Sequence, residues 1–273
     1  MMTTSNHRRP RSRLMFTARR LVDLAPPRLS LAAVDAVERR SGEAELKLLP
    51  ALVRPGSNAA DIGANRGVYA RRLARLCPLV LAFEPQPSLA ARLARATPSN
   101  VVVFPVALSG SAGEATLKVP VVGSVVAHTR ATLGESEGEY NEQAVFRLRL
   151  DDMGLTSLGF LKIDVEGHEM ELLDGAMATI ETCRPRLLVE CDALTGSHPH
   201  EVLERLAPHG YEGWFHHSDS LLPVSDFEVE VHQGERKEFG GRRPEGLVMN
   251  FMFLPASEAT EVRRAVRDLL GAR

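Results

Sequence analysis

Apolar residues along the chain alternate between short continuous runs and runs with helical spacing. The continuous runs predict buried strands, most clearly at residues 79–83 and 160–165, and further strands at 101–108 and 186–191. A shorter and less apolar strand is expected at residues 57–62. Between these runs, apolar residues recur every three or four positions, as at Leu89, Ala90, Leu93 and Ala94, which indicates helices. Strands that alternate with helices in this way are typical of a parallel sheet covered by helices on both faces.

The flanking segments extend this α/β pattern. Residues 31–53 are compatible with a helical segment that ends at Pro55-Gly56, and residues 172–180 predict one helix after the fourth strand. Residues 115–119 and 145–150 predict two short extra strands around a Gly-rich polar loop at 123–141. The C-terminal third predicts strands at 211–216 and 247–254, with helices at 202–207 and 262–269.

Composition indicates a soluble globular chain. Of its 273 residues, 44% are hydrophobic and 25% are charged, with 33 Lys+Arg against 35 Asp+Glu, so a disordered chain is excluded and no nucleic-acid partner is expected. No apolar run reaches the roughly 18 residues of a membrane span. Three widely spaced cysteines argue against a disulfide framework, and we therefore expect a cytoplasmic location.

The N-terminus differs from the rest of the chain. Residues 1–20 contain six arginines, and no acidic residue precedes Asp23. We interpret residues 1–30 as a basic, disordered tail that makes at most weak surface contacts, and residues 31–273 as one domain. An organelle transit peptide and a membrane-surface patch are the alternatives for this tail.

A glycine-rich turn follows the first predicted strand. It has the sequence Asp61-Ile62-Gly63-Ala64-Asn65-Arg66-Gly67, between a strand and a helix. Gly63 allows the backbone to approach a ligand closely, and Gly67 allows the helix to begin tightly against the sheet. Because the middle position is Asn65 and a carboxylate precedes Gly63, the turn disfavours a pyrophosphate. It suits a cationic ligand such as S-adenosylmethionine.

The second strand also ends in a carboxylate. Phe83-Glu84-Pro85 follows Asp61 at the distance where an acid accepts hydrogen bonds from both hydroxyls of an adenosine ribose. Parallel sheets bind ligands beyond the carboxyl ends of their strands, so Asp61 and Glu84 are expected at the same edge. Together they predict a nucleoside cofactor.

The fourth strand leads into a second cluster of ionisable residues. The segment is Lys162-Ile163-Asp164-Val165-Glu166-Gly167-His168-Glu169, and Asp164, Glu166 and His168 are its candidate catalytic residues. Histidine titrates near neutral pH and is a natural general base for a hydroxyl group. Glu169 fits a structural role near a helix N-terminus. Asp164 and Glu166 also fit a divalent metal that acidifies the hydroxyl, although two carboxylates alone are weak support and we favour no metal.

These motifs, in this order, resemble the FkbM-type S-adenosylmethionine-dependent methyltransferases. The similarity runs from about Pro55 to Pro255 and includes the segments at 106–117, 150–152 and 250–255. It implies a Rossmann-like class I methyltransferase fold whose seven-stranded, mostly parallel sheet has an antiparallel last strand. It also implies a set of cofactor-binding residues: Asp61, Gly63, Ala64, Asn65, Gly67, Glu84, Ala107 and Asp164.

The resemblance implies methyl transfer to a hydroxyl of a small-molecule or glycan acceptor, such as a sugar, glycolipid or secondary metabolite. In-line attack on an activated methyl group requires mainly alignment of the two reactants, with His168 or a neighbouring carboxylate as base. Two alternatives stay open. One is a methyltransferase-like module that binds a partner without turnover, and the other is a nicotinamide-dependent oxidoreductase, against which Asp61 and Asn65 argue.

Overall fold

The structure is a computed structural model that describes residues 25–41, 44–122, 125–126, 131–134, 138–194, 196–218, 220–234 and 246–271. The first described helix, α2, spans Pro27–Ser41 and so begins within the segment interpreted as a tail. Residues 1–24 and much of the predicted 123–141 loop lie outside the described residues. None of the described helices is both long and apolar enough to cross a bilayer.

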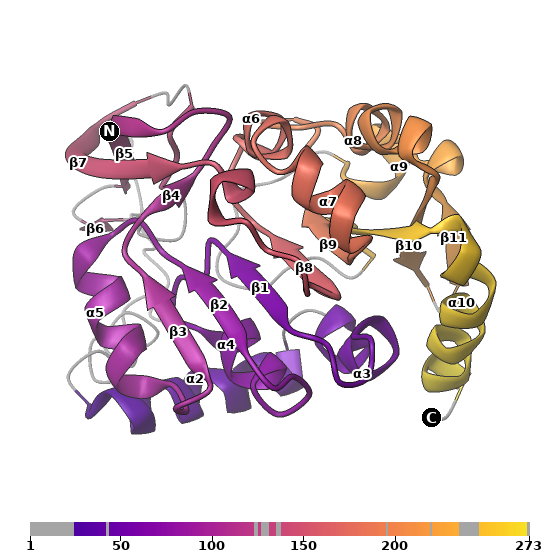
Figure 1. Ribbon diagram of the computed structural model, residues 1–273, viewed down its shortest axis with the longest axis horizontal. Helices are drawn as coiled ribbons and strands as arrows, with labels where there is room; N and C mark the ends of the chain where they lie inside the picture. Colours follow the sequence, from indigo (N-terminus) through magenta and orange to yellow (C-terminus); the bar gives the residue numbers. More distant parts are fainter. Residues whose placement is uncertain are drawn as a thin grey trace, which may run out of the picture.

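Eight strands form the central sheet, in the order β11-β10-β12-β9-β8-β1-β2-β3 (Figure 1). Five of them, β1, β2, β3, β8 and β9, pair in parallel, whereas β12 is antiparallel to both β9 and β10. The predicted α/β fold and its antiparallel last strand are therefore confirmed. The strands are β1 Ala59–Ile62, β2 Val80–Phe83, β3 Val101–Phe104, β8 Phe160–Ile163, β9 Arg186–Glu190, β10 Tyr211–His217, β11 Ser220–Pro223 and β12 Asn250–Pro255.

The strand count differs from the seven that the family resemblance implies. The additional strand is β11, which forms an antiparallel hairpin with β10 through pairs such as Phe215 with Leu222. Ser218 has a φ of 45°, so the chain enters the left-handed region where it leaves β10. That conformation reverses the chain tightly enough for β11 to extend the sheet by one edge strand.

Helices cover both faces of this sheet. Alternate strand residues face opposite sides, so Ala59 and Phe160 pack on one face while Ala60 and Leu161 pack on the other. The first face is covered by α3, α4, α5 and α10, and the second by α6, α7 and α8. The helices are α3 Leu49–Leu52, α4 Val68–Leu73, α5 Pro87–Ala96, α6 Glu169–Asp174, α7 Met177–Cys183, α8 Pro199–Leu206, α9 Val229–His232 and α10 Ala256–Gly271, with short turns η1 Ala44–Lys47, η3 Leu150–Met153, η4 Ala207–His209 and η5 Val224–Asp226.

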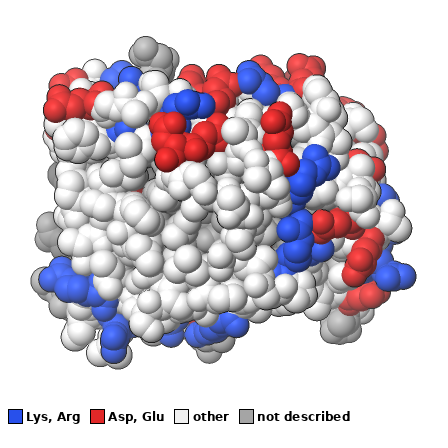
Figure 2. Space-filling model, viewed as in Figure 1, with Lys and Arg blue, Asp and Glu red and all other residues white. Residues whose placement is uncertain are grey.

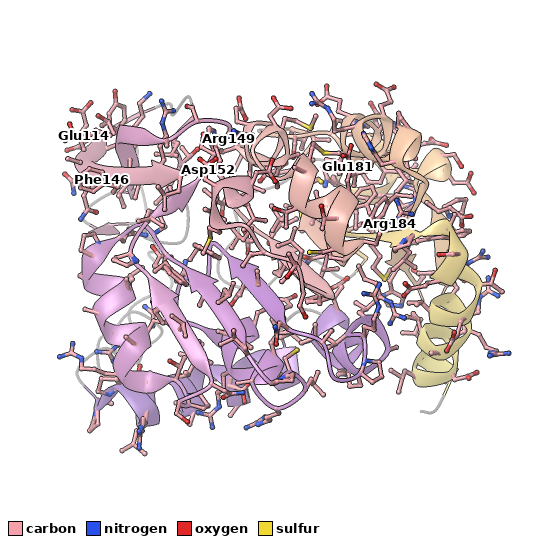
Figure 3. All side chains as sticks on the ribbon, viewed as in Figure 1. Glu114, Phe146, Arg149, Asp152, Glu181 and Arg184 are labelled. Atoms are coloured by element: carbon pink, nitrogen blue, oxygen red, sulfur yellow. The ribbon has the colours of Figure 1, made fainter. Side chains whose placement is uncertain are left out.

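A second, smaller sheet interrupts the predicted third strand. The run at 101–108 divides at Pro105 into β3 of the central sheet and β4, Ala107–Leu108, because proline has no N–H to continue a ladder. The second sheet has the order β4-β7-β5-β6, with β5 at Gly113–Val122, β6 at Val125–Val126 and β7 at Tyr140–Leu148. Glu114 and Phe146 pair across β5 and β7, the two inner strands of this sheet, on the left side of the view in Figure 3.

The helix predicted over 172–180 is two helices instead of one. Gly175 separates α6 from α7, and a Cβ there would lie 2.0 Å from the carbonyl oxygen of Ser109. The carboxylate of Asp151 accepts hydrogen bonds from the N–H and hydroxyl of Thr179, both at 2.8 Å, and so helps to begin α7. The apolar spacing across 172–180 does not reveal this break.

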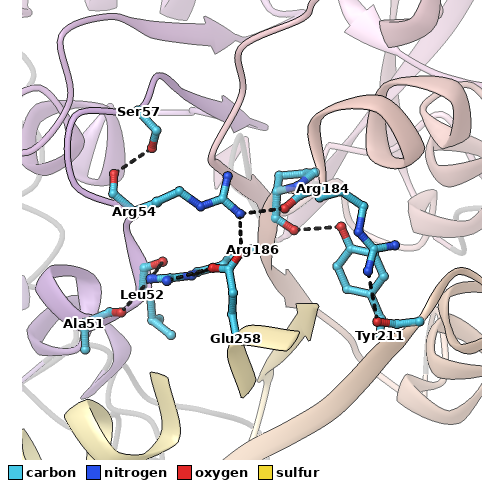
Figure 4. Close-up of polar contacts among 10 residues, drawn as sticks. Ala51, Leu52, Arg54, Ser57, Arg184, Arg186, Tyr211 and Glu258 are labelled. Atoms are coloured by element: carbon cyan, nitrogen blue, oxygen red, sulfur yellow. Dashed lines mark hydrogen bonds and ion pairs between the residues drawn. The ribbon is translucent and has the colours of Figure 1, made fainter. Parts of the chain in front are cut away.

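A polar network joins the N-terminal helices to the C-terminal helix. The carboxylate of Glu258 in α10 lies 2.7 Å from Arg54 and 2.8 Å from Arg186 (Figure 4). Arg54 also donates to the carbonyl of Arg184, and Arg186 donates to the carbonyl of Ala51. Burial alone would raise the pKa of Glu258, but the hydrogen bonds from both guanidinium groups lower it. This network ties β9, α10 and the segment after α3 together.

Candidate functional site

The glycine-rich turn connects β1 to α4 and packs directly against the segment after β8. Gly63 has a φ of +77°, and a Cβ at this position would lie 1.8 Å from the carbonyl oxygen of Asp164. Gly67 has a φ of +84°, and a Cβ there would lie 2.1 Å from Leu93 of α5. Both positions therefore require glycine, for conformation and for space. The turn brings the segments that contain Asp61 and Asp164 together, as the sequence predicts.

Glu84 links the end of β2 to this turn. Its Oε2 accepts a hydrogen bond from the backbone N–H of Asn65, and its Oε1 accepts one from the N–H of Gln86, both at 2.9 Å. The side chain is buried, and burial raises the pKa of Glu84 to about 7 against the lowering effect of these hydrogen bonds. Each carboxylate oxygen has a second lone pair for a ligand donor. The observed geometry suits an acid that fixes the turn and accepts further hydrogen bonds.

Asp61 is fully enclosed at the end of β1. In the register of the sheet it lies directly beside Lys162 of β8, on the face covered by α4. Burial raises the pKa of Asp61 to about 7, the ammonium group of Lys162 opposes this rise, and the carboxylates of Asp164 and Glu84 add to it. Within the described part of the chain, Oδ2 of Asp61 has no hydrogen-bond partner. A buried carboxylate with an unused acceptor is costly unless something supplies a donor.

Lys162 is the central cation of this group and was not expected from the sequence. Its side chain is fully buried, and its Nζ lies 3.6 Å from Asp164 and 3.9 Å from Glu190 at the end of β9. It also donates to the carbonyl of Ile163 and lies 5.1 Å from the centre of the Tyr69 ring. A lysine inside an apolar strand is the signal that could have identified it, because lysine is rarely buried without anionic partners.

The residues present fit the cofactor that the turn suggests. S-adenosylmethionine carries an amino group and a sulfonium, and the unpartnered Oδ2 of Asp61 is a buried acceptor for such a donor. Glu84, held by the N–H of Asn65, has the acceptor oxygens that ribose hydroxyls would require. Asp164 follows β8 next to Gly63. Ala107 is buried in β4, on the second sheet, and Ala64 is buried within the turn.

His168 belongs to a different set of contacts. Its ring is buried at the start of α6, where Nε2 lies 2.9 Å from the hydroxyl oxygen of Ser109 and Nδ1 lies 3.5 Å from Glu171. Burial lowers the pKa of His168, an effect that Glu171 opposes and Arg147 reinforces. The lowered pKa favours the neutral imidazole, which is the form that can accept a proton. Ser109, just after β4, is a partner that the motif analysis missed.

The remaining residues of the β8 cluster divide into exposed and structural groups. Glu166 is exposed and has a φ of 49°, so it occupies the tight part of the turn before α6. Glu169 is buried, and its two oxygens accept hydrogen bonds from the N–H of Gly167 and the hydroxyl of Ser197. Within the described ranges, no group of three or more His, Cys, Asp or Glu side chains is arranged to hold a metal ion.

Comparison with known proteins gives a family match. The model of the methyltransferase FkbM domain matches residues 61–213, which contain the glycine-rich turn, Glu84 and the β8 cluster. A comparison with the curated proteins gave no match.

Solved structures that resemble the chain include methyltransferases. The methyltransferase FkbM of Methylobacillus flagellatus has 16% identity and a TM-score of 0.46, covering 84% of this chain, which spans only 58% of that protein. A TehB-like SAM-dependent methyltransferase of Corynebacterium glutamicum has 16% identity and a TM-score of 0.41, with 81% of this chain and 92% of that chain covered. The precorrin-6y C5,15-methyltransferase of Geobacter metallireducens has 12% identity and a TM-score of 0.42, with 77% of this chain and 86% of that chain covered.

The family match covers more than half of the chain and includes both motif clusters described above. The order of the central sheet and its antiparallel β12 agree with the fold that the family resemblance implies. The chain therefore belongs to the FkbM methyltransferase domain family.

Proposed function

We propose that this protein is an S-adenosylmethionine-dependent methyltransferase that methylates a hydroxyl group on a sugar, glycolipid or secondary metabolite. The observation that carries the proposal is the buried, unpartnered Oδ2 of Asp61, next to Glu84 at the ends of two adjacent strands. An ammonium donor and a ribose are the two features of the cofactor that these carboxylates would recognise.

One set of side chains would bind the cofactor, and a second set would accept the proton of the substrate hydroxyl. Asp61, Glu84 and the turn residues Gly63, Ala64, Asn65 and Gly67 would hold the cofactor, with Ala107 near its adenine and Asp164 beside Lys162. When bound, the cofactor supplies a methyl group already activated by a sulfonium. The protein then contributes mainly by aligning the acceptor oxygen with this methyl group, and such alignment lowers the activation barrier of well-oriented reactions by roughly 7–11 kcal/mol.

The acceptor hydroxyl must lose its proton as its oxygen forms the new bond to carbon. His168 is the proposed base because it lies at the start of α6, directly after the β8 cluster, and its lowered pKa favours the neutral imidazole, the form that accepts a proton. Ser109, at 2.9 Å from Nε2, orients the ring. Asp164 and Glu166 are the further catalytic candidates. Asp164 lies 3.6 Å from Nζ of the buried Lys162, whereas the side chain of Glu166 is exposed.

Calorimetric titration of the full chain tests the cofactor. We expect micromolar binding of S-adenosylmethionine to the wild type, and at least tenfold weaker binding by Asp61→Asn and by Glu84→Gln. Glu261→Gln is the matched control, because it removes the same charge from the exposed surface of α10. NADH is the competing ligand, and its binding in place of S-adenosylmethionine would favour the nicotinamide-dependent oxidoreductase.

The acceptor is addressed once the cofactor is established. A screen of sugar, glycolipid and polyketide hydroxyls with labelled S-adenosylmethionine should give transfer that His168→Ala reduces without changing cofactor affinity. If the protein binds S-adenosylmethionine but transfers no methyl group to any class, the non-catalytic binding module becomes the better account. If a folded protein binds neither cofactor, the methyltransferase proposal fails.

A further inference from the structure

A basic depression lies at the end of the sheet opposite the candidate site. It has a volume of about 350 Å³ and is lined by Arg28, Arg71, Arg75, Ala96, Thr97 and Pro98. Helices α4 and α5 begin beyond the carboxyl ends of β1 and β2 and return toward the amino ends of the strands. Arg75 and Pro98 follow the C-terminal ends of these helices, so the depression is separate from Asp61 and Glu84.

The arginines of this depression have unused donors. In the part of the chain that the structure describes, neither Arg28 nor Arg75 makes an ion pair, and both are exposed. Nε of Arg71 is buried without a hydrogen-bond partner and lies 3.8 Å from Asp35. Asp35 is already engaged by Arg72 at 2.7 Å, so it does not neutralise both guanidinium groups. No acidic side chain lines the depression among the described residues.

The surroundings add to this positive charge. Arg28 lies in the first turn of α2, a helix of 15 residues with no acidic residue in that turn. The partial positive charge of the helix N-terminus is therefore not offset there by a carboxylate of the same turn. Figure 2 shows blue side chains without red ones on the lower left rim, over α2 and α5 of Figure 1, whereas red side chains gather along the upper rim.

We propose that the depression formed by Arg28, Arg71 and Arg75 binds a phosphate group. Guanidinium groups match phosphate oxygens in planar, two-point hydrogen bonds, and three of them around one concavity suit a doubly charged phosphate monoester. The open side of the depression admits a phosphate that belongs to a soluble organic molecule or to a lipid headgroup. This site is independent of the proposed methyl transfer, since it uses none of the same residues.

The test uses the full chain and two probes. Inorganic phosphate is titrated calorimetrically in a phosphate-free buffer, and sedimentation is measured with vesicles of phosphatidylcholine containing about one fifth phosphatidic acid. The site variant is Arg28→Gln with Arg75→Gln. The control is Arg264→Gln with Arg267→Gln, which removes the same charge from the exposed surface of α10. Both variants keep the six arginines of residues 1–20.

We expect phosphate binding by the wild type and the control variant, and at least tenfold weaker binding by the site variant with an unchanged unfolding temperature. Vesicle sedimentation that is lost in the site variant alone would assign the phosphate to a lipid headgroup. Phosphate binding without sedimentation would assign it to a soluble molecule. Absence of phosphate binding by the wild type, or equal losses in both variants, would overturn the proposal, since general surface charge would then explain the attraction.

Discussion

Replacement of Asp61 by asparagine should stabilise the ligand-free protein while it weakens cofactor binding at least tenfold. The pKa of Asp61 rises from 3.8 to about 7 in the folded protein because the side chain is buried. At 1.36 kcal/mol per tenfold change in proton affinity, ionisation of Asp61 lowers the free energy of unfolding by about 4 kcal/mol. The amide of asparagine is also buried and lies beside Lys162, so we expect a net gain of about 1–3 kcal/mol at pH 8.

The same substitution should change how stability depends on pH. Between about pH 4 and pH 7 the folded state retains a proton on Asp61 that the unfolded state releases, so the stability of the wild type falls as pH rises. Asp61→Asn removes this contribution, whereas the slopes due to Glu84 and Glu169 remain, because burial also raises the pKa of each of these carboxyl groups.

Urea unfolding at pH 5 and pH 8, followed by the fluorescence of the single tryptophan, Trp214, measures both effects. Asp152→Asn is the control, because the Asp152 side chain is 50% exposed and, among the residues that the structure describes, pairs only with Arg149 at 3.6 Å (Figure 3). Its unfolding free energy should change by less than about 0.5 kcal/mol. If Asp61→Asn lowers the unfolding free energy at pH 8 without ligand, the pairing with Lys162 outweighs burial and the reasoning is refuted.

Three further substitutions test the packing around the site and the network at the opposite end of the sheet. Gly63→Ala should lower the free energy of unfolding by about 3 kcal/mol or more, because the added Cβ meets the backbone of Asp164. Gly56 has a similar φ but open space around it, so Gly56→Ala should lower that free energy by only about 1 kcal/mol, measured by urea unfolding. Lys162→Met should destabilise the protein by about 3 kcal/mol in the same assay, because the carboxylates of Asp164 and Glu190 lose their cation. An unchanged unfolding midpoint would contradict this. Glu258→Gln should lower stability by about 1–2 kcal/mol at pH 7, by calorimetry, and the loss should vanish as pH falls through the lowered pKa of Glu258.

The sequence predicts the parts of this fold that depend on local pattern. Buried strands such as Val80–Phe83 are continuous apolar runs, and the turn at Gly63 and Gly67 carries its conformational requirement in its glycines. The edge of the sheet where Asp61, Glu84 and Asp164 meet follows from the alternation of strands and helices. The apolar runs and the turn glycines are short-range signals, whereas the shared edge follows from the order of strands and helices along the chain.

The features that escape prediction depend on contacts between distant segments. At the break between α6 and α7, residue 175 must be glycine because the backbone of Ser109 occupies the space of a Cβ, and no helical periodicity records this contact. The pairing of His168 with Ser109 joins the N-cap of α6, after β8 of the central sheet, to the residue that follows β4 of the second sheet. Lys162 was overlooked because its partners, Asp61 and Glu190, come from neighbouring strands far away in sequence.

The position of β12 has a consequence for the order in which the chain folds. In the described sheet, β10 and β11 reach the remaining strands only through β12, which lies between β10 and β9 and is the last strand of the chain. During synthesis, the parallel strands from β1 to β9 are complete some sixty residues before Asn250–Pro255 is made. Until then the β10–β11 hairpin has no strand through which it can pair with them. The sheet is thus closed by its C-terminal strand, and a ribosome-bound chain that stops short of β12 should leave β10 and β11 open to proteolysis while β1, β2 and β8 are already protected.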